Sequence, residues 1–359
     1  MSRVGGQLAA VRPQSRDLLH VFFVDDSGVL RCLVEEPFSG AVANWRPVQL
    51  PQADGLPFST DYHPAGAVAT GHQMRGERFD VFTVDRDGML RLYYADGRSG
   101  WRSDVVPDAL GIPPGSGLVT GYLDGGGKLA VFSAGRAGEL LCFTGTDDER
   151  WRKLQLPLGG TLPHGANLAT GYLATGYLAE RGRLAVFAVD RDGAFQVLVE
   201  ETGGMWNPLS PAEARLPAGA PLATGYRRRG VDPSVFVVDD DGDLREFRFD
   251  GQTWRSQVLP GGGLTSPASV ATGYQDDQQL LVFVVDEVGR LRQYACRPDG
   301  SWTVGIVPNG NGLPAGTPLA TGYRENGTVL DVFALPRQPA GAPIHYSGYG
   351  GGWTGPHSF

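Results

Sequence analysis

The chain has 359 residues, a formal net charge of −8, and 53 glycines and 26 prolines. With 41% hydrophobic residues it is too apolar for a disordered chain, yet it has no uncharged apolar run long enough for a membrane helix. The acidic balance opposes a phosphate backbone, and the one basic run, Arg227 to Arg229, is short, so we expect neither a nucleic-acid nor a membrane partner.

The first element in chain order is "MSRVGGQLAAVRPQSRD", which lacks the apolar segment and cleavage site of a secretory signal. We therefore expect a cytoplasmic protein, with non-classical export left open.

Cys32, Cys142 and Cys296 carry no metal-binding spacing, so we interpret them as reduced core thiols. We expect no metal and no cofactor.

A Val-Phe pair followed by a short apolar strand then recurs along the chain, beginning at Val21, Val81, Val131, Val186, Val235, Val282 and Val332. Most copies continue into an acidic-Gly turn such as "VDRDG", and one tryptophan follows each pair, at Trp45, Trp101, Trp151, Trp206, Trp254, Trp302 and Trp353. A small-residue segment, "ATGY" or a relative, precedes each pair, and only "LAAVR" from Leu8 represents it in the first copy. We therefore predict that each repeat forms four β-strands.

Four strands in a repeat of roughly 40 to 50 residues are typical of a propeller blade. We predict an all-β fold, a seven-bladed β-propeller of four antiparallel strands per blade, forming one domain over residues 1–359. The predicted blades span residues 8–52, 67–107, 117–157, 168–210, 221–260, 269–308 and 318–359.

The fourth module contains "LATGY" twice, from Leu168 to Tyr177. Ala174 lies 12 residues before Val186, as in most other modules, so we expect the second copy to form the strand. The extra residues are interpreted as a slippage insertion that forms a bulge or longer loop; an inserted functional loop is the alternative.

Two repeated residue series are candidate ligand-binding groups. A planar guanidinium can hydrogen-bond sugar hydroxyls while an aromatic face stacks on the C–H surface of the ring. The arginines follow the third-strand leucine, and the tyrosines end the small-residue strand: Arg31, Arg91, Arg245, Arg292, Tyr122, Tyr177, Tyr226, Tyr274 and Tyr323. The alternative for the arginines is packing over the blade surface. We expect the site on the face formed by the second turn of each blade and the connections between blades.

Paired aspartates such as Asp85 and Asp87 resemble the start of a calcium loop, but no later Glu completes it, so we interpret them as hairpin turns. No histidine has metal spacing or a neighbouring nucleophile motif, and the catalytic residues stay unknown. His63, His72 and His345 are the candidates for a catalytic role, His72 because it replaces the tyrosine of "ATGY".

The order of these motifs over the whole chain resembles the fucose-binding lectin superfamily, and most of all the seven-bladed bacterial lectins of the PLL type. "GGGLTSPASVATGY" from Gly261, "LDVF" from Leu330 and "GDLREFRFDGQTW" from Gly242 carry the resemblance. It implies carbohydrate binding in pockets between blades, usually several per ring.

The chain departs from that family's pattern at the residues that bind fucose. The fungal fucose lectins have an arginine directly before the Val-Phe pair, where this chain has His20, Asp80, Ala130, Ala185, Ser234, Leu281 and Asp331. The family's site glutamate is matched only by Glu246, and the aromatic residue after the inner strand is Tyr or His instead of Trp. A fucose site of that kind is therefore expected to be incomplete in one blade and absent in six.

Two functions stay open at this point. One is a lectin-like sugar-binding propeller with repeated sites between blades. The other is an enzyme, such as a lyase, hydrolase or cyclase, or a small-molecule binder with one site at the channel mouth, where blades one, three and seven diverge most. A platform for protein interactions is a third possibility. We favour binding over catalysis because no acid–base pair converges on one axis; the oligomeric state is not predicted.

Overall fold

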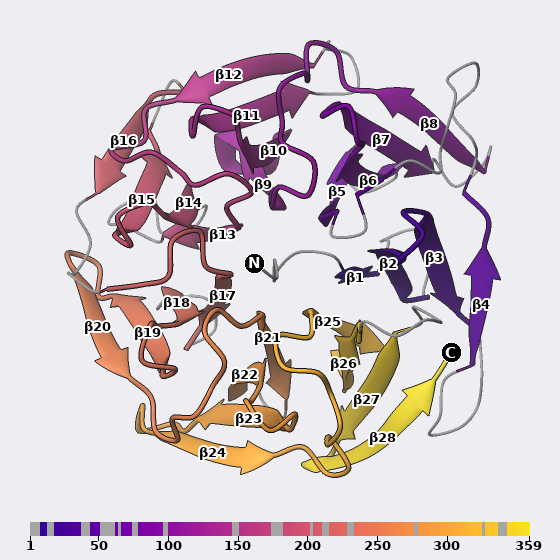
Figure 1. The fold of residues 1–359 in the computed structure, drawn as a ribbon, viewed down its shortest axis with the longest axis vertical. Coiled ribbons are helices and arrows are strands. Elements are labelled where there is room, and N and C mark those ends of the chain that lie inside the picture. The colour runs from indigo at the N-terminus through magenta and orange to yellow at the C-terminus, as the bar shows by residue number, and fades with distance from the viewer. Residues whose placement is uncertain are drawn as a thin grey trace.

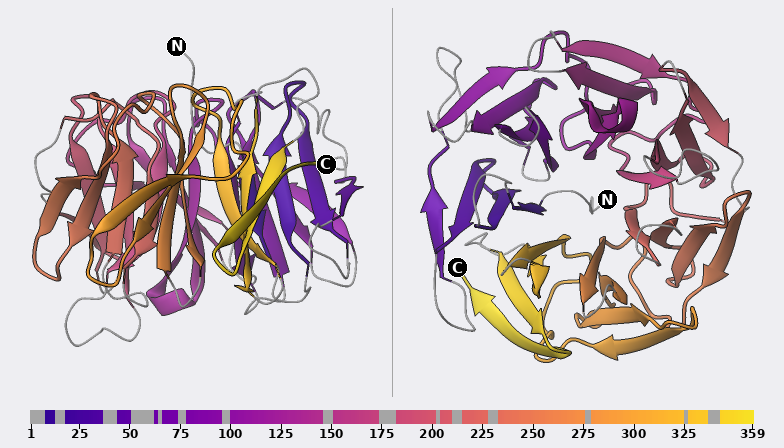
Figure 2. Two further views of the ribbon diagram at one scale, coloured as in Figure 1. Left: turned by 90° about the horizontal axis from the view of Figure 1, so that it is seen from below. Right: turned by 180° about the vertical axis from the view of Figure 1, so that it is seen from behind.

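A computed structural model describes residues 8–12, 18–36, 44–50, 62–63, 66–73, 78–95, 100–145, 151–173, 182–201, 204–209, 215–227, 233–275, 279–324, 327–336 and 343–359. Seven antiparallel sheets of four strands surround a central axis, which confirms the predicted seven-bladed propeller (Figure 1). The strands run along the thickness of the disc, as the side view in Figure 2 shows. None of the helices among these residues is long and apolar enough to cross a membrane.

The strands of each blade, from the axis outwards, have the following bounds. Blades 1 to 3 contain β1 (Leu8–Val11), β2 (His20–Val24), β3 (Leu30–Glu35) and β4 (Trp45–Val48); β5 (Val68–Gln73), β6 (Arg78–Val84), β7 (Leu90–Ala95) and β8 (Trp101–Val105); and β9 (Leu118–Leu123), β10 (Lys128–Ala134), β11 (Leu140–Gly145) and β12 (Arg152–Leu156), with the short helix η2 (Asp124–Gly126) between β9 and β10. Blades 4 and 5 contain β13 (Leu168–Leu173), β14 (Arg183–Val189), β15 (Phe195–Glu200) and β16 (Trp206–Leu209); and β17 (Ala223–Tyr226), β18 (Pro233–Val238), β19 (Leu244–Phe249) and β20 (Trp254–Val258). Blades 6 and 7 contain β21 (Val270–Gln275), β22 (Gln279–Val285), β23 (Leu291–Cys296) and β24 (Trp302–Ile306); and β25 (Leu319–Arg324), β26 (Val329–Ala334), β27 (Ile344–Tyr349) and β28 (Gly352–Ser358).

The duplicated segment in blade 4 differs from our expectation. The first copy forms the inner strand β13, in which Thr170 pairs with Val186 just as Thr120 pairs with Val131 in blade 3. The prediction that the copy at Ala174 keeps the register is wrong. The connection before β13 is fixed in length because Leu162 is buried and hydrogen-bonds with Gly138, so the extra residues fall between β13 and β14. Residues 174–181, including Tyr177, lie outside the described residues.

The second strand of each blade is buried on both faces because it packs against both neighbouring blades. Val235 belongs to the hydrophobic cluster shared with blade 4, and Phe236 to the one shared with blade 6. We call the contact between one blade and the next a seam. This two-sided burial is the reason for the apolar Val-Phe repeat in the sequence.

A tryptophan–phenylalanine contact recurs at all seven seams. The tryptophan at or next to the start of the outer strand of one blade packs edge-on against the Val-Phe phenylalanine of the preceding blade, with ring centroids 5.5–5.8 Å apart and interplanar angles of 71–87°. This edge-to-face geometry is the favoured one for aromatic pairs. The contact between Trp45 and Phe333 joins the first blade to the last.

The "ATGY" strand carries a second set of contacts around the axis. Its threonine hydroxyl donates to the threonine carbonyl of the preceding blade, as Thr224 does to Thr170 at 2.7 Å. Its tyrosine hydroxyl accepts a hydrogen bond from the inner strand of the preceding blade, from the backbone N–H of the residue after the glycine. Tyr226 accepts the N–H of Tyr172 in this way at 2.6 Å. Glycine is needed at this position because a Cβ on Gly225 would lie 2.6 Å from Leu280 of the next blade. The motif is therefore required by close packing of the inner strands.

The seam between blades 7 and 1 closes the ring without a shared strand, because none of the described sheets takes a strand from another repeat. Its aromatic cluster joins Trp45, Phe333, His345 and Phe359. His345 is fully buried, and among the described residues neither of its ring nitrogens has a hydrogen-bond partner. Burial, with the nearby charges of His357 and Arg324, lowers the pKa of His345 to about 3.

Replacing Tyr226 by Phe leaves the backbone N–H of Tyr172 without its acceptor. We expect Tyr226→Phe to lower the free energy of unfolding by about 1–2 kcal/mol, measured by urea denaturation. The matched control is Tyr349→Phe, since Tyr349 is 67% exposed and its loss should leave stability unchanged. Equal stability of the Tyr226 variant and the wild type would show that the hydrogen bond contributes nothing.

Because His345 is buried, we expect acid to lower the free energy of unfolding. Between pH of about 6.5 and 3 the unfolded chain binds a proton at this residue that the folded chain does not, so the free energy of unfolding should fall as the pH falls, by about 1 kcal/mol per pH unit. Asp331 and Glu35 also lie at this seam, so the wild type must be compared with His345→Phe across the same pH range. The difference in stability between the two proteins should shrink or reverse in favour of the variant below pH 6. Parallel pH profiles would contradict this assignment.

Candidate functional site

The tyrosines predicted as ligand-binding groups lie around the axis, where their hydroxyls already accept backbone N–H groups of the neighbouring blade. Tyr122, Tyr226, Tyr274 and Tyr323 all make this bond, at 2.6–2.7 Å. Tyr172, and not Tyr177, is the blade 4 member, and it receives the N–H of Tyr122 at 2.8 Å. Burial raises the pKa of these phenols, so they stay protonated. A ligand role for them is still a prediction, and the contacts seen are structural.

The four predicted arginines each pair with the first aspartate of their own hairpin turn. The Nε atoms of Arg31, Arg91 and Arg292 lie 2.7–2.9 Å from their aspartates, and Arg245 Nη2 lies 2.9 Å from Asp239. In blade 2 the other oxygen of Asp85 accepts the backbone N–H groups of Asp87 and Met89. The acidic turn and the arginine therefore hold the second hairpin together, and a ligand role for these arginines also remains a prediction.

The candidate histidines lie in three separate settings. His63 lies in the connection that leads into blade 2, next to Tyr62, which bridges to Asp85. His72 is half-buried against Phe79, and burial lowers its pKa. His345 lies inside the seam between blades 7 and 1. The described structure does not bring them together into one catalytic site.

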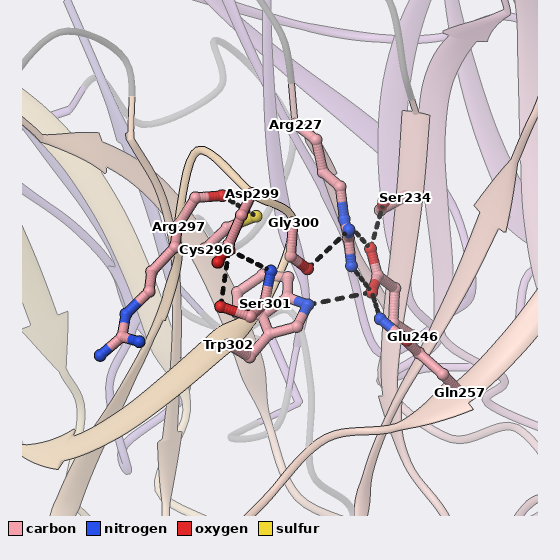
Figure 3. Close-up of polar contacts among 10 residues, drawn as sticks. All are labelled: Arg227, Ser234, Glu246, Gln257, Cys296, Arg297, Asp299, Gly300, Ser301 and Trp302. Atoms are coloured by element: carbon pink, nitrogen blue, oxygen red, sulfur yellow. Dashed lines mark hydrogen bonds and ion pairs between the residues drawn. The ribbon is translucent and has the colours of Figure 1, made fainter.

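Glu246 lies at the centre of a polar cluster between blades 5 and 6 (Figure 3). Its side chain is fully buried in β19 and forms a two-point ion pair with Arg227, whose side chain is 5% exposed. Ser234 and Gln257 donate to the carboxylate at 2.6 and 2.5 Å, and Trp302 of the next blade donates its indole N–H at 3.1 Å. Five donors thus converge on one carboxylate.

Arg227 also binds the neighbouring blade. Its Nη1 donates to the carbonyl of Gly300 at 3.0 Å, and its guanidinium lies 5.3 Å from the Trp302 ring centroid. A buried charge pair is tolerated only when its hydrogen bonds are satisfied, and this cluster meets that condition. Cys296 lies at the same seam, and burial raises the pKa of its thiol, so it is not a reactive nucleophile.

The register shows that Glu246 occupies a special position. It pairs with Phe236 of the Val-Phe pair and therefore faces the next blade. The equivalent residues in the other blades are Cys32, Leu92, Cys142, Val197, Gln293 and His345. Only blade 5 has a carboxylate there.

The sequence reasoning named Glu246 but missed Arg227, Gln257 and the role of Trp302. The fungal fucose lectins have their arginine directly before the Val-Phe pair, where this chain has Ser234, whereas Arg227 comes directly after "ATGY". A usable signal existed, since alternation along the inner strand points the residue after the tyrosine toward the next blade. The cluster lies near the turns between the first and second and the third and fourth strands, at the end of the blades opposite to the one we expected.

Comparisons with known proteins support the fold. No family model and no curated protein matches the chain. Among solved structures, the BP39L lectin from Burkholderia pseudomallei is 28% identical with a TM-score of 0.85, and the match covers 99% of both chains. AofleA from Arthrobotrys oligospora is 14% identical with a TM-score of 0.58, covering 82% of this chain and 86% of its own.

A variant of the Aleuria aurantia lectin in complex with α-methyl-L-fucoside is 16% identical with a TM-score of 0.56, covering 83% of this chain and 96% of its own. Likeness at 14–16% identity supports the fold alone, whereas the likeness to BP39L extends over nearly the whole chain. The resemblance inferred from the repeats is therefore confirmed: the chain is a seven-bladed propeller similar in sequence and structure to propeller lectins.

Proposed function

We propose that this protein is a lectin-like carbohydrate-binding propeller and that the cluster of Arg227, Glu246 and Trp302 between blades 5 and 6 is its principal sugar site. The observation that carries the proposal is the buried two-point pair of Arg227 and Glu246 beside an aromatic ring of the next blade. Adjacent sugar hydroxyls both donate and accept hydrogen bonds, so they match a carboxylate next to a guanidinium. The lectin neighbours, including one with bound α-methyl-L-fucoside, support the carbohydrate-binding function.

The crowding at Glu246 suggests how a sugar enters. A carboxylate offers about four lone-pair directions, and five donors surround this one. Gln257 is the exposed donor, whereas Ser234 is fully buried. A sugar hydroxyl therefore replaces the Gln257 amide at the carboxylate, and the ring packs against half-buried Trp302.

The enzyme alternative has less support. The solved structures that resemble the chain are lectins, and this favours binding over catalysis. The absence of nucleic-acid and membrane partners and the cytoplasmic location remain predictions, as does the bacterial origin that the resemblance to the PLL-type lectins implies.

We expect the purified protein to bind at least one member of a panel of methyl glycosides of L-fucose, galactose, mannose, glucose and N-acetylglucosamine, measured by isothermal titration calorimetry. Glu246→Gln should weaken the binding at least about tenfold, because a charged hydrogen-bond acceptor is lost. Arg227→Lys should also weaken it, since lysine cannot form the two-point pair.

The matched control is Glu200→Gln, which alters a half-buried acid on the third strand of blade 4 and should leave binding unchanged. No binding of any panel member by the folded wild type, or unaltered binding by both variants at the blade 5–blade 6 seam, would refute the proposal.

A further inference from the structure

The seams differ sharply in polarity at two equivalent positions that face the next blade. The first follows the "ATGY" aromatic and is occupied in blades 2 to 7 by Gln73, Leu123, Leu173, Arg227, Gln275 and Arg324. The second precedes the Val-Phe pair and is occupied in the same blades by Asp80, Ala130, Ala185, Ser234, Leu281 and Asp331. The seams that follow blades 3 and 4 are apolar at both positions. Ion pairs that include one of these positions form at the seams that follow blades 2, 5 and 7. Blade 4 also has an ion pair, between Arg183 and Glu201 at 2.6 Å, but neither residue lies at these two positions.

The seam between blades 2 and 3 carries a rearranged version of the candidate site. Asp80 is fully buried, and its Oδ1 lies 2.8 Å from Arg78 Nε. The Arg78 guanidinium lies 4.3 Å from the centroid of Tyr94, the residue that pairs with Asp80 across the strands. Leu92 stands where blade 5 has Glu246, so the carboxylate has moved from the third strand to the second.

Two further features of this seam suit a ligand. Gln73 is 7% exposed, and its amide nitrogen has no hydrogen-bond partner among the described residues. A buried donor without an acceptor is costly, and a bound oxygen atom would satisfy it. Tyr94 and Trp151 are half-buried aromatic side chains that pack on the same hydrophobic cluster, and Trp151 is the counterpart of Trp302.

We propose that the seam between blades 2 and 3 is a second carbohydrate site, formed by Gln73, Arg78, Asp80, Tyr94 and Trp151. The inference rests on the proposed lectin function. Its ligand is a neutral sugar, because Arg78 and Asp80 cancel in charge and the buried carboxylate disfavours an acidic one. Arg78 and Asp80 bind neighbouring hydroxyls, Gln73 donates to a sugar oxygen, and Tyr94 and Trp151 contact the C–H surface.

The seam between blades 7 and 1 does not form a third such site. Arg324, Asp331 and Ser347 are each at most 5% exposed and bond one another at 2.6–3.0 Å, whereas the cluster at Glu246 includes the exposed donor Gln257, which a hydroxyl can replace. Its aromatic groups are used to close the ring. We therefore infer two sites, at the seams after blades 2 and 5. The seams after blades 3 and 4 have apolar side chains at both positions, and the seam after blade 6 has Gln275 at the first position but Leu281 at the second.

The test is a titration of four proteins with the same methyl glycoside panel: wild type, Asp80→Asn, Glu246→Gln and the double variant. Calorimetry should give two sites for the wild type, one for each single variant and none for the double variant. Arg78→Met serves if Asp80→Asn does not fold, because Arg78 lies at the beginning of its strand and is 16% exposed. The matched control is Lys128→Met, which removes a cation at the equivalent position of the apolar seam after blade 3 and should leave two sites.

The outcomes separate the two proposals. A single wild-type site that Glu246→Gln removes and Asp80→Asn or Arg78→Met leaves unaltered overturns the second site and keeps the proposed function. Loss of one site in Asp80→Asn or Arg78→Met, with no effect of Glu246→Gln, supports the second site and overturns the first. Binding that neither seam's variants alter overturns both.

Discussion

The edge-on contact between a tryptophan of one blade and a phenylalanine of the preceding blade is the interaction on which the ring depends. It occurs at every seam with nearly the same geometry. An isolated blade exposes apolar side chains on both faces, so it can bury them only between two neighbours. Repeating one contact around the ring satisfies every blade at once, and this explains why the tryptophans and the Val-Phe pairs are equal in number.

Because each blade must bury both faces, few positions at a seam can hold a charged or polar side chain. Residues that face a seam near its middle must pack, and most of the equivalents of Glu246 are apolar or small. A buried carboxylate at that position is tolerated because Arg227, Ser234 and Trp302 donate to it from three different segments of the chain. In blade 2 the carboxylate lies nearer the end of the blade, paired with Arg78 over an aromatic face. Charged pairs therefore mark individual seams within an otherwise regular ring.

The ring is regular in its backbone but not in its chemistry, and this limits what repetition in a sequence means. The tyrosines recur because their hydroxyls bind the backbone of a neighbouring inner strand. The arginines recur in four blades, where each binds the aspartate of its own turn. The groups that best fit a sugar are instead singular, as Glu246 is. In this chain the repeated residues stabilise the fold, and the candidate sites lie where a blade departs from the repeat.

The sequence by itself determined the number of blades, the order of strands and the buried character of the Val-Phe strand, because these follow from local periodicity and turn residues. The resemblance to the fucose-binding lectins also singled out Glu246. Only the tertiary structure decided that Arg227 pairs with this carboxylate, that the tyrosine hydroxyls bind neighbouring backbone, and that the first copy of "LATGY" forms the strand. The physical reason is that these contacts join residues from different strands and blades, whose approach is set by the closing of the ring and by the fixed length of packed connections rather than by spacing along the chain.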